Sequence, residues 1–196
     1  RCDYQDPDSD GDRILDGDEV YTYGTSPSSA FDGPTPFYTF DTNTQNWGAE
    51  TGDFGIASIA WTNVGYPRGG ALAVSPPAGS GYGDYYIRDG WPFDNRDVVA
   101  RPVYGLWMYV PTSAPVNAMQ IQLWVKTTSD GWLGHYGGFT TPTSGLWNAI
   151  LWDMTSLGTQ VLSDVDEWAV KLVWTNRSVW NGTVWIDSIH VLPAAA

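Results

Sequence analysis

Carboxylates recur at alternate positions near the amino terminus, in a spacing that can wrap oxygen ligands around a calcium ion. Counted from Asp8, ligand positions one, three, five, seven, nine and twelve fall on Asp8, Asp10, Asp12, the carbonyl of Ile14, Asp16 and Glu19. Counting from Asp6 puts Gly11 at the sixth position, where a tight turn is needed, but leaves Gly17 at the twelfth without a carboxylate. We prefer the register from Asp8, although it places Arg13 where glycine is wanted.

A second group of candidate residues lies on one face of an expected strand, residues 118–126. Apolar and polar side chains alternate there without a slip, which is typical of a strand with one face in a core. The other face carries Gln120, Gln122, Trp124 and Lys126. A pyranose ring has an apolar face that packs on aromatic rings, and its hydroxyls bond to planar amides, so these residue types favour sugar binding.

Neighbouring strands are expected to extend this binding face. The apolar alternation of residues 106–110 turns Trp107 and Tyr109 outward, and that of residues 170–172 turns Lys171 outward. We expect all three to join the glutamines and Trp124 on a single sheet. Trp61 and Trp132 are expected near the ends of that sheet, where they would wall a cleft.

The two opposed carboxyl groups that glycosidase chemistry requires are not expected on this face. The acidic residues of the main domain fall mostly in turns or beside Gly and Pro, and none is expected among the outward side chains. Cys2, the single cysteine, has no base partner and cannot form an internal disulfide. The chain is therefore predicted not to be an enzyme, although Lys126, Lys171 and Tyr109 leave a polysaccharide lyase or glycosidase as an alternative.

Charge and composition narrow the class of partner. The 196 residues carry a net charge of −13, which disfavours nucleic acid and anionic membrane as partners. Residues 1–33 hold nine Asp and Glu against two Arg, and residues 34–196 hold thirteen against seven basic residues. No apolar run approaches the ~20 residues that a membrane span requires. Twelve Trp and eleven Tyr exceed what a core of this size absorbs, so some aromatic rings are expected at a recognition surface.

The elements that must position these residues are nine expected strands, separated by turns rich in Gly, Pro, Asn and Asp. They span residues 37–41, 56–61, 71–75, 85–88, 104–110, 118–126, 147–153, 168–174 and 183–191. The expected fold class is all-β: a two-sheet antiparallel β-sandwich (jelly roll) with a short N-terminal calcium-loop segment and almost no helix. One sheet is expected to hold 56–61, 104–110, 118–126 and 168–174, and the other to pair the first strand with the last.

Residues 6–27, which continue from the carboxylates into Glu-Val-Tyr-Thr-Tyr-Gly-Thr-Ser-Pro, resemble a thrombospondin type 3 repeat. This EF-hand-like calcium repeat joins domains of secreted bacterial proteins. The resemblance implies structural Ca²⁺ and a secreted, extracellular and bacterial protein; a solvated acidic linker without an ordered ion is the alternative. We therefore divide the chain into residues 1–33, a repeat and linker, and residues 34–196, a β-sandwich module.

The order of motifs in the main domain resembles the jelly-roll carbohydrate-binding modules of secreted glycoside hydrolases. The motifs are Phe-Tyr-Thr-Phe-Asp at 37–41, Asn-Trp-Gly at 46–48, Gly-Gly-Ala-Leu-Ala-Val at 69–74, residues 106–111, Gly-Leu-Trp at 145–147 and Val-Trp-Ile-Asp-Ser-Ile at 184–189. The resemblance implies a non-catalytic polysaccharide-binding sandwich with calcium on Asp41 and Asp187. A turn cap at Asp187 and an Asx-turn from Asp41 to Asn43 are the alternative.

The expected function is to target an attached secreted enzyme to a plant-type polysaccharide, with β-glucan, xyloglucan or mannan favoured and acidic glycans left open by the two lysines. The expected partners are a polysaccharide or oligosaccharide and a neighbouring catalytic domain in the same polypeptide, and the module is expected to be a monomer. A structural or adhesive spacer domain of a secreted multidomain protein is the alternative from another class.

Overall fold

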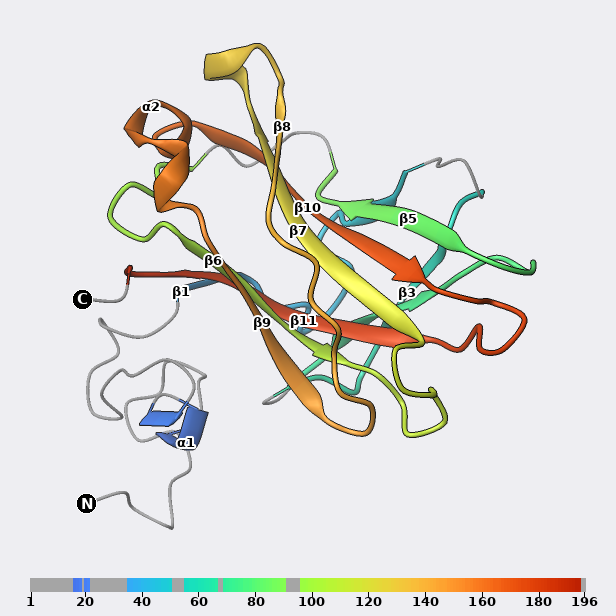
Figure 1. Cartoon of the computed structure of the whole chain (residues 1–196). Coiled ribbons are helices and arrows are strands. Elements are labelled where there is room, and N and C mark those ends of the chain that lie inside the picture. Colours follow the sequence, from blue (N-terminus) through green and yellow to red (C-terminus); the bar gives the residue numbers. More distant parts are fainter. Residues whose placement is uncertain are drawn as a thin grey trace.

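The computed structural model describes residues 16–18, 20–21, 35–50, 55–66, 69–90 and 96–194, and it is nearly all β (Figure 1). Two antiparallel sheets pack face to face, as the sequence predicts. The helical elements are single turns: α1 (Asp16–Asp18), α2 (Thr159–Leu162), η2 (Thr128–Asp130) and η3 (Thr155–Leu157). No helix in the described part of the chain is long and apolar enough to cross a membrane.

The six-stranded sheet has the order β3-β4-β11-β6-β9, with β1 pairing with β11 outside this path. Its strands are β1 (Thr35–Tyr38), β3 (Ser58–Thr62), β4 (Ala71–Ser75), β6 (Val103–Tyr109), β9 (Trp147–Asp153) and β11 (Val184–Leu192). The five-stranded sheet has the order β2-β5-β10-β7-β8. Its strands are β2 (Gly48–Ala49), β5 (Gly83–Arg88), β7 (Met119–Thr127), β8 (Gly134–Tyr136) and β10 (Val165–Trp174).

The core lies between the two sheets and follows the alternation of apolar residues along each strand. Ile121, Leu123 and Val125 of β7 are buried beside Val170 and Leu172 of β10 in one continuous apolar cluster. All nine expected strands are present, and the expected ends of β4 and β9 coincide with the observed ones. Among the described residues, the elements that sequence reasoning missed are short, namely β2, β8 and the helical turns, which are too brief to show a period.

The expected pairing of the first strand with the last is confirmed, because β1 pairs with β11. The expected composition of the other sheet is wrong. β3 and β6 lie in the six-stranded sheet, whereas β7 and β10 lie in the five-stranded sheet. Residues 110–118, which connect β6 to β7 and include Pro111 and Pro115, carry the chain from one sheet to the other. Alternation within a strand is a local property and does not reveal such a crossing.

A buried carboxylate at the end of β5 joins three strands. Asp89 is 1% exposed; its Oδ1 accepts the backbone N–H of Trp168 at 3.0 Å, and its Oδ2 accepts the hydroxyl of Tyr38 at 3.2 Å. Burial raises the pKa of Asp89 to about 7, against these hydrogen bonds, which lower it. Asp89 therefore links β5, β10 and β1 at the cost of keeping a carboxyl group away from water.

We predict that Asp89→Asn removes a pH dependence of stability. The folded pKa lies above that of the unfolded chain, so Asp89 stabilises the fold fully below about pH 4, and this contribution is lost as the pH rises through about 7. Urea unfolding at pH 4.5 and pH 7.5 should show the variant gaining roughly 2–4 kcal/mol relative to wild type over this interval. Asp97→Asn, at an exposed position, is the control; equal pH profiles for wild type and Asp89→Asn would contradict the prediction.

Candidate functional site

The polar side of β7 belongs to the outer face of the five-stranded sheet, as its alternation predicts. Gln122 is paired with Lys171 of β10, which is paired in turn with Tyr86 of β5. On the other side of β7, Trp124 is paired with Tyr136 of β8. Cross-strand partners project to the same side of a sheet, so four strands contribute to one surface. We call this surface the polar face: Asp84, Tyr86, Arg88, Gln120, Gln122, Trp124, Lys126, Tyr136, Glu167 and Lys171.

Trp124 lies on the polar face, but neighbouring side chains cover its indole and shield it from solvent. Its side chain is only 2% exposed. Tyr136 stacks on it with ring centroids 5.7 Å apart, Tyr86 meets it edge-on at 6.0 Å, and the Nζ of Lys126 lies 4.8 Å from its ring centroid. Tyr136 is 52% exposed, so its ring is the one that solvent and a ligand meet first.

Every cation of the polar face is paired with a carboxylate. The ammonium of Lys171 lies 2.7 Å from Asp84. Glu167 lies 2.8 Å from the guanidinium of Arg88 and 3.4 Å from the ammonium of Lys126, although its side chain is only 2% exposed. Burial alone would lower the pKa of Lys171, but hydrogen bonds to Asp84 and Tyr86 outweigh it and raise that pKa above its ordinary value. The face is therefore rich in charged hydrogen-bonding groups. With Glu50, which lies 3.5 Å from Arg88, three carboxylates balance its three cations.

The segment that follows β8 is anchored to the polar face through Gln122. Its side-chain amide donates to the carbonyl of Gly137 at 2.7 Å, and the backbone N–H of Gly137 donates to Leu123 at 2.9 Å. Phe139, farther along the segment, is 51% exposed and lies 5.9 Å from the Nζ of Lys171. One edge of the polar face thus carries two exposed rings, Tyr136 and Phe139.

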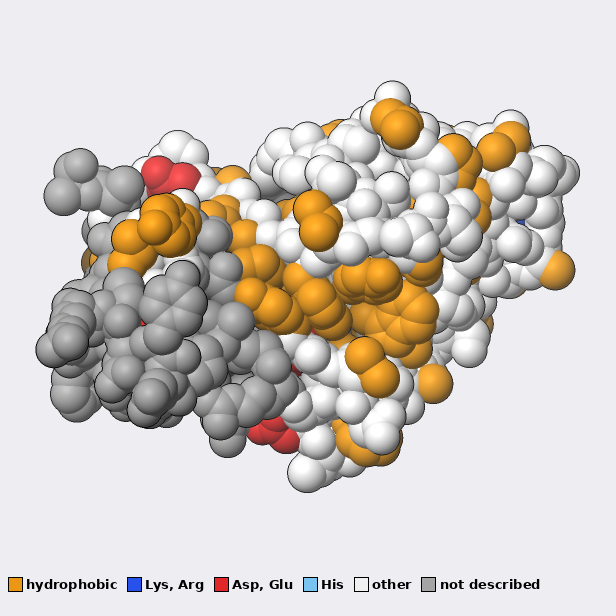
Figure 2. Space-filling model, turned by 90° about the horizontal axis from the view of Figure 1, so that it is seen from below, with side chains coloured by type: hydrophobic (Ala, Val, Ile, Leu, Met, Phe, Trp, Pro, Cys, Tyr) orange, Lys and Arg blue, Asp and Glu red, His pale blue; other side chains and the backbone are white. Residues whose placement is uncertain are grey.

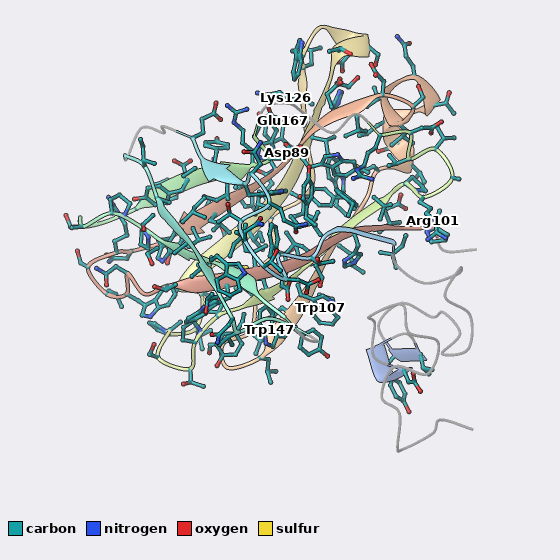
Figure 3. All side chains as sticks on the ribbon, turned by 180° about the vertical axis from the view of Figure 1, so that it is seen from behind. Asp89, Arg101, Trp107, Lys126, Trp147 and Glu167 are labelled. Carbon is teal, nitrogen blue, oxygen red and sulfur yellow. The ribbon has the colours of Figure 1, made fainter. Side chains whose placement is uncertain are left out.

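Trp107 and Tyr109 do not join this surface, contrary to the expectation from sequence. They lie on β6, on the outer face of the six-stranded sheet, because β6 and β7 belong to different sheets. Figure 3 shows Trp107 and Trp147 on the side of the sandwich opposite Lys126 and Glu167. We call this cluster the apolar face: Tyr66, Trp107, Tyr109, Trp147 and Trp185, with neighbouring ring centroids 4.6–5.7 Å apart. Hydrophobic side chains gather on this side of the molecule in Figure 2.

The two tryptophans expected at the ends of the binding sheet lie apart from each other. Trp61, which is 41% exposed, belongs to β3 of the six-stranded sheet, and its indole N–H donates to the carbonyl of Phe40 at 2.7 Å. Trp132, which is 40% exposed, lies in the hairpin between β7 and β8. Trp132 is therefore next to a strand of the polar face, whereas Trp61 belongs to the other sheet.

Five residues of the polar face were missed or misread from the sequence: Asp84, Tyr86, Arg88, Tyr136 and Glu167. The expectation that no acid lies on this face is wrong, because Asp84 and Glu167 both do. Residues 83–88 alternate inward and outward, which could have placed Asp84, Tyr86 and Arg88 on one side of a strand. The pairing of β5 with β10 and β7, which brings them beside Gln122, carries no comparable signal in the sequence.

Asp41 and Asp187 lie close together, because β1 and β11 are neighbours. Asp187 is fully buried; burial first, and then the charge of Asp41, raise its pKa to about 8. A Cβ at Gly69 would collide with the Asp41 carboxylate, and one at Gly65 would collide with the Gly70 carbonyl and lie 2.5 Å from the Asp187 carboxylate. Glycines thus allow carboxylate and carbonyl oxygens to approach the backbone closely beside both aspartates.

The backbone is strained beside each of these aspartates. Phe40 has a φ of 50° and Ser188 a φ of 48°, a region that residues other than glycine rarely occupy. No three His, Cys, Asp or Glu side chains converge among the described residues. A cation bound by the two aspartates would therefore need carbonyl oxygens in addition to the two carboxylates, which is ordinary for calcium.

The expected ligands of the amino-terminal calcium loop, Asp8, Asp10, Asp12, Ile14 and Glu19, lie outside the described residues. Asp16, the remaining one, is buried at the start of α1. Calcium binding by this segment stays a prediction.

No protein-family model and no curated protein matches the sequence, but solved structures do resemble the model. A structure of carbohydrate-binding modules from the β-sandwich superfamily has a TM-score of 0.56 at 15% identity and covers 86% of this chain, which spans only 64% of that longer chain. The CBM27-1 module of Caldicellulosiruptor saccharolyticus, solved with mannohexaose, has a TM-score of 0.57 at 12% identity over 84% of this chain and 99% of its own. The family 11 module of a cellulosomal cellulase from Clostridium thermocellum has a TM-score of 0.55 at 18% identity, over 83% and 95%.

The fold is that of the β-sandwich carbohydrate-binding modules. This similarity confirms the expected fold class over most of the chain. At such low identities it establishes the fold alone, so any function must be argued from the two faces and the aspartate pair.

We predict that Glu167→Gln destabilises the fold by about 1–3 kcal/mol, because it removes the negative charge that Arg88 and Lys126 share beneath the polar face. The loss is smaller than for a fully buried pair because both cations remain partly hydrated. Glu50→Gln, at the more exposed acid 3.5 Å from Arg88, should change stability by less than ~0.5 kcal/mol. Urea unfolding of the three proteins measures both values, and equal effects of the two variants would contradict the prediction.

Proposed function

We propose that the chain is a non-catalytic carbohydrate-binding module whose polar face holds a neutral polysaccharide. The observation that carries the proposal is the combination, on one sheet, of exposed aromatic rings with amides and ion pairs whose charges cancel. Aromatic rings such as Tyr136 offer an apolar surface to the C–H face of a sugar. Gln120 and the ion-paired groups offer donors and acceptors to its hydroxyls.

The charge balance favours a neutral polymer over an acidic one. Lys126 and Lys171 were the reason to leave acidic glycans open, and both are engaged with carboxylates. A uronate would have to compete with Glu167 or Asp84 for its cation. Among neutral polymers we favour β-glucan, xyloglucan or mannan, and structural neighbours solved with mannohexaose or a mixed-linked β-1,3-1,4 tetrasaccharide support this choice.

Catalysis is disfavoured because the carboxyl groups of the polar face are ion-paired or buried. Glycosidase chemistry needs one carboxyl group free to donate a proton and another free to attack or activate water. Asp84 and Glu167 are instead ion-paired, and Glu167 is almost fully buried. The proposed role is to keep an attached secreted enzyme at its substrate and so raise its effective concentration there.

A second candidate function is a structural or adhesive spacer in a multidomain protein. The observation in its favour is the apolar face, where partly exposed rings of Tyr109, Trp147 and Trp185 lie near the exposed side chains of Leu146 and Leu151. Apolar surface of this kind often marks a protein contact. The spacer role requires the apolar face and not the polar face, so variants on the two faces distinguish the candidates.

We further propose that Asp41 and Asp187 hold a structural calcium ion, together with nearby carbonyl oxygens such as that of Gly70. The close approach of carboxylate and carbonyl oxygens to Gly65 and Gly69, and the strained backbone at Phe40 and Ser188, support this proposal. The ion would neutralise two neighbouring carboxylates and fix the segment that follows β1 against β11. With the proposed calcium repeat of residues 6–27, this suits a secreted bacterial protein in a calcium-rich exterior.

We predict that Tyr136→Ala weakens polysaccharide binding by roughly 3–10-fold, because the variant removes the most exposed ring of the polar face. Native affinity electrophoresis through gels containing barley β-glucan, xyloglucan, galactomannan, xylan or pectin measures the effect. Gln122→Ala should act in the same direction, since it frees the segment at Gly137 as well as removing an amide.

Tyr109→Ala is the matched control for this experiment, because it removes the same side chain from the apolar face. It should migrate through every gel as wild type does. Retardation lost with Tyr109→Ala but kept with Tyr136→Ala would place the sugar on the wrong sheet for this proposal. Wild type that no polymer retards would favour the spacer.

We predict that calcium raises the unfolding temperature by a few °C through the Asp41–Asp187 pair. At 10 mM calcium, a site of ordinary extracellular affinity contributes roughly 1.5–2.7 kcal/mol. Asp41→Asn should remove this part of the shift, whereas Asp153→Asn, at an exposed carboxylate, should keep it. Any calcium at residues 8–19 acts equally in both variants, so equal shifts in the two would count against the site.

A further inference from the structure

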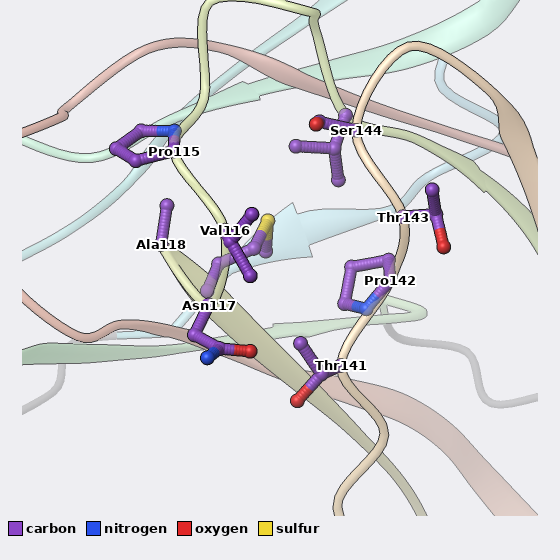
Figure 4. Close-up of a pocket in the computed structure, with 10 residues that line it drawn as sticks. Pro115, Val116, Asn117, Ala118, Thr141, Pro142, Thr143 and Ser144 are labelled. Carbon is purple, nitrogen blue, oxygen red and sulfur yellow. The ribbon is translucent and has the colours of Figure 1, made fainter.

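A pocket separate from the polar face opens at one end of the sandwich, between residues 110–119 and residues 141–144 (Figure 4). Its volume is about 360 Å³, at the lower end of the range for small-molecule sites. One wall is the connection from β6 to β7, and the other is the chain that leads from β8 into β9. Both walls thus come from segments that join strands.

The two walls are held in place by hydrogen bonds. The hydroxyl of Thr175 lies within donating distance of the carbonyls of Asn117 and Ala118, at 2.8 and 3.0 Å. On the opposite wall, Asn148 accepts the backbone N–H of Thr143 at 2.8 Å and donates to its carbonyl at 2.9 Å. The N–H of Gly145 donates to Val110 at 2.7 Å and ties the walls together. The pocket is therefore preformed, which lowers the entropic cost of binding.

The side chains that line the pocket combine free polar groups with apolar surface and carry no charge. Within the described residues, the amide of Asn117 and the hydroxyls of Thr141, Thr143 and Ser144 form no hydrogen bond with the protein. Pro115 and Pro142 supply apolar surface beside them. An uncharged ligand with several hydroxyls and an apolar face matches this lining, and an ion does not.

We propose that this pocket is a second carbohydrate site, which takes one or two neutral pyranose units such as a chain end or a side branch. The amide of Asn117 and the hydroxyl of Thr141 bind sugar hydroxyls, and the two prolines contact the C–H face of the ring. The proposal does not depend on the polar face, because none of the pocket residues belongs to it.

The test follows backbone amide signals of the ¹⁵N-labelled full chain during titration with methyl β-D-glucopyranoside, methyl β-D-mannopyranoside and methyl β-D-xylopyranoside through the millimolar range. We expect saturable shifts of the amides at 116–118, 141, 143 and 144 with at least one glycoside. The double variant Asn117→Gly and Thr141→Val should bind roughly tenfold more weakly, for two lost hydrogen bonds. Glycine is chosen because Asn117 has a φ of 60°, which alanine would strain.

Tyr136→Ala is the control, since it alters the polar face and leaves the pocket intact. It should show the same pocket shifts as wild type even if polymer retardation is lost, so the two sites succeed or fail separately. No saturable shift with any of the three glycosides would overturn the proposal. So would shifts that persist unchanged in the double variant while its remote amides match wild type.

Discussion

The pairing of β7 with β10 is the constraint on which the polar face depends. Residues 119–127 run antiparallel to 165–174, so Gln122, Trp124 and Lys126 lie beside Lys171, Ala169 and Glu167. A slip of one residue would turn every side chain of one strand to the opposite side of the sheet and place charges in the core. Ala169 is fully buried, and its small side chain leaves room for the neighbouring indole of Trp124. The ion pairs, the packing of rings around Trp124 and the hydrogen bond from Gln122 to Gly137 all depend on this register.

The same physical reasons explain what the sequence could and could not predict. Alternation along residues 119–127 is local, and it correctly turned Gln122 and Trp124 away from the core. The partition of strands between sheets depends on contacts between distant residues, and there the expectation failed: Trp107 and Tyr109 lie on the opposite side of the sandwich. The burial of Trp124 could not be predicted from the sequence either. It results from contacts with Tyr86 and Tyr136, which lie on strands whose pairing the sequence did not show.

For Asp41 and Asp187, in contrast, the pairing of distant strands was predicted correctly. Asp41 and Asp187 were expected to be neighbours only because the first strand was expected beside the last, and that pairing is present. The close packing of oxygen atoms around them depends on Gly65, Gly69 and Gly70, whose role is visible only once the chain is folded. The strand pairing could thus be predicted from the sequence, whereas the packing of oxygens around the two aspartates is visible only in the structure.

The paired charges of the polar face also determine how this surface presents itself at a distance. Lys171 with Asp84, and Arg88 and Lys126 with Glu167 and Glu50, form compact neutral groups whose fields largely cancel within a few ångströms. Such a surface neither gathers nor repels mobile ions, so contact with an uncharged polymer releases no counterions. The affinity for the polymer should then vary little with salt concentration, although the protein as a whole is strongly acidic.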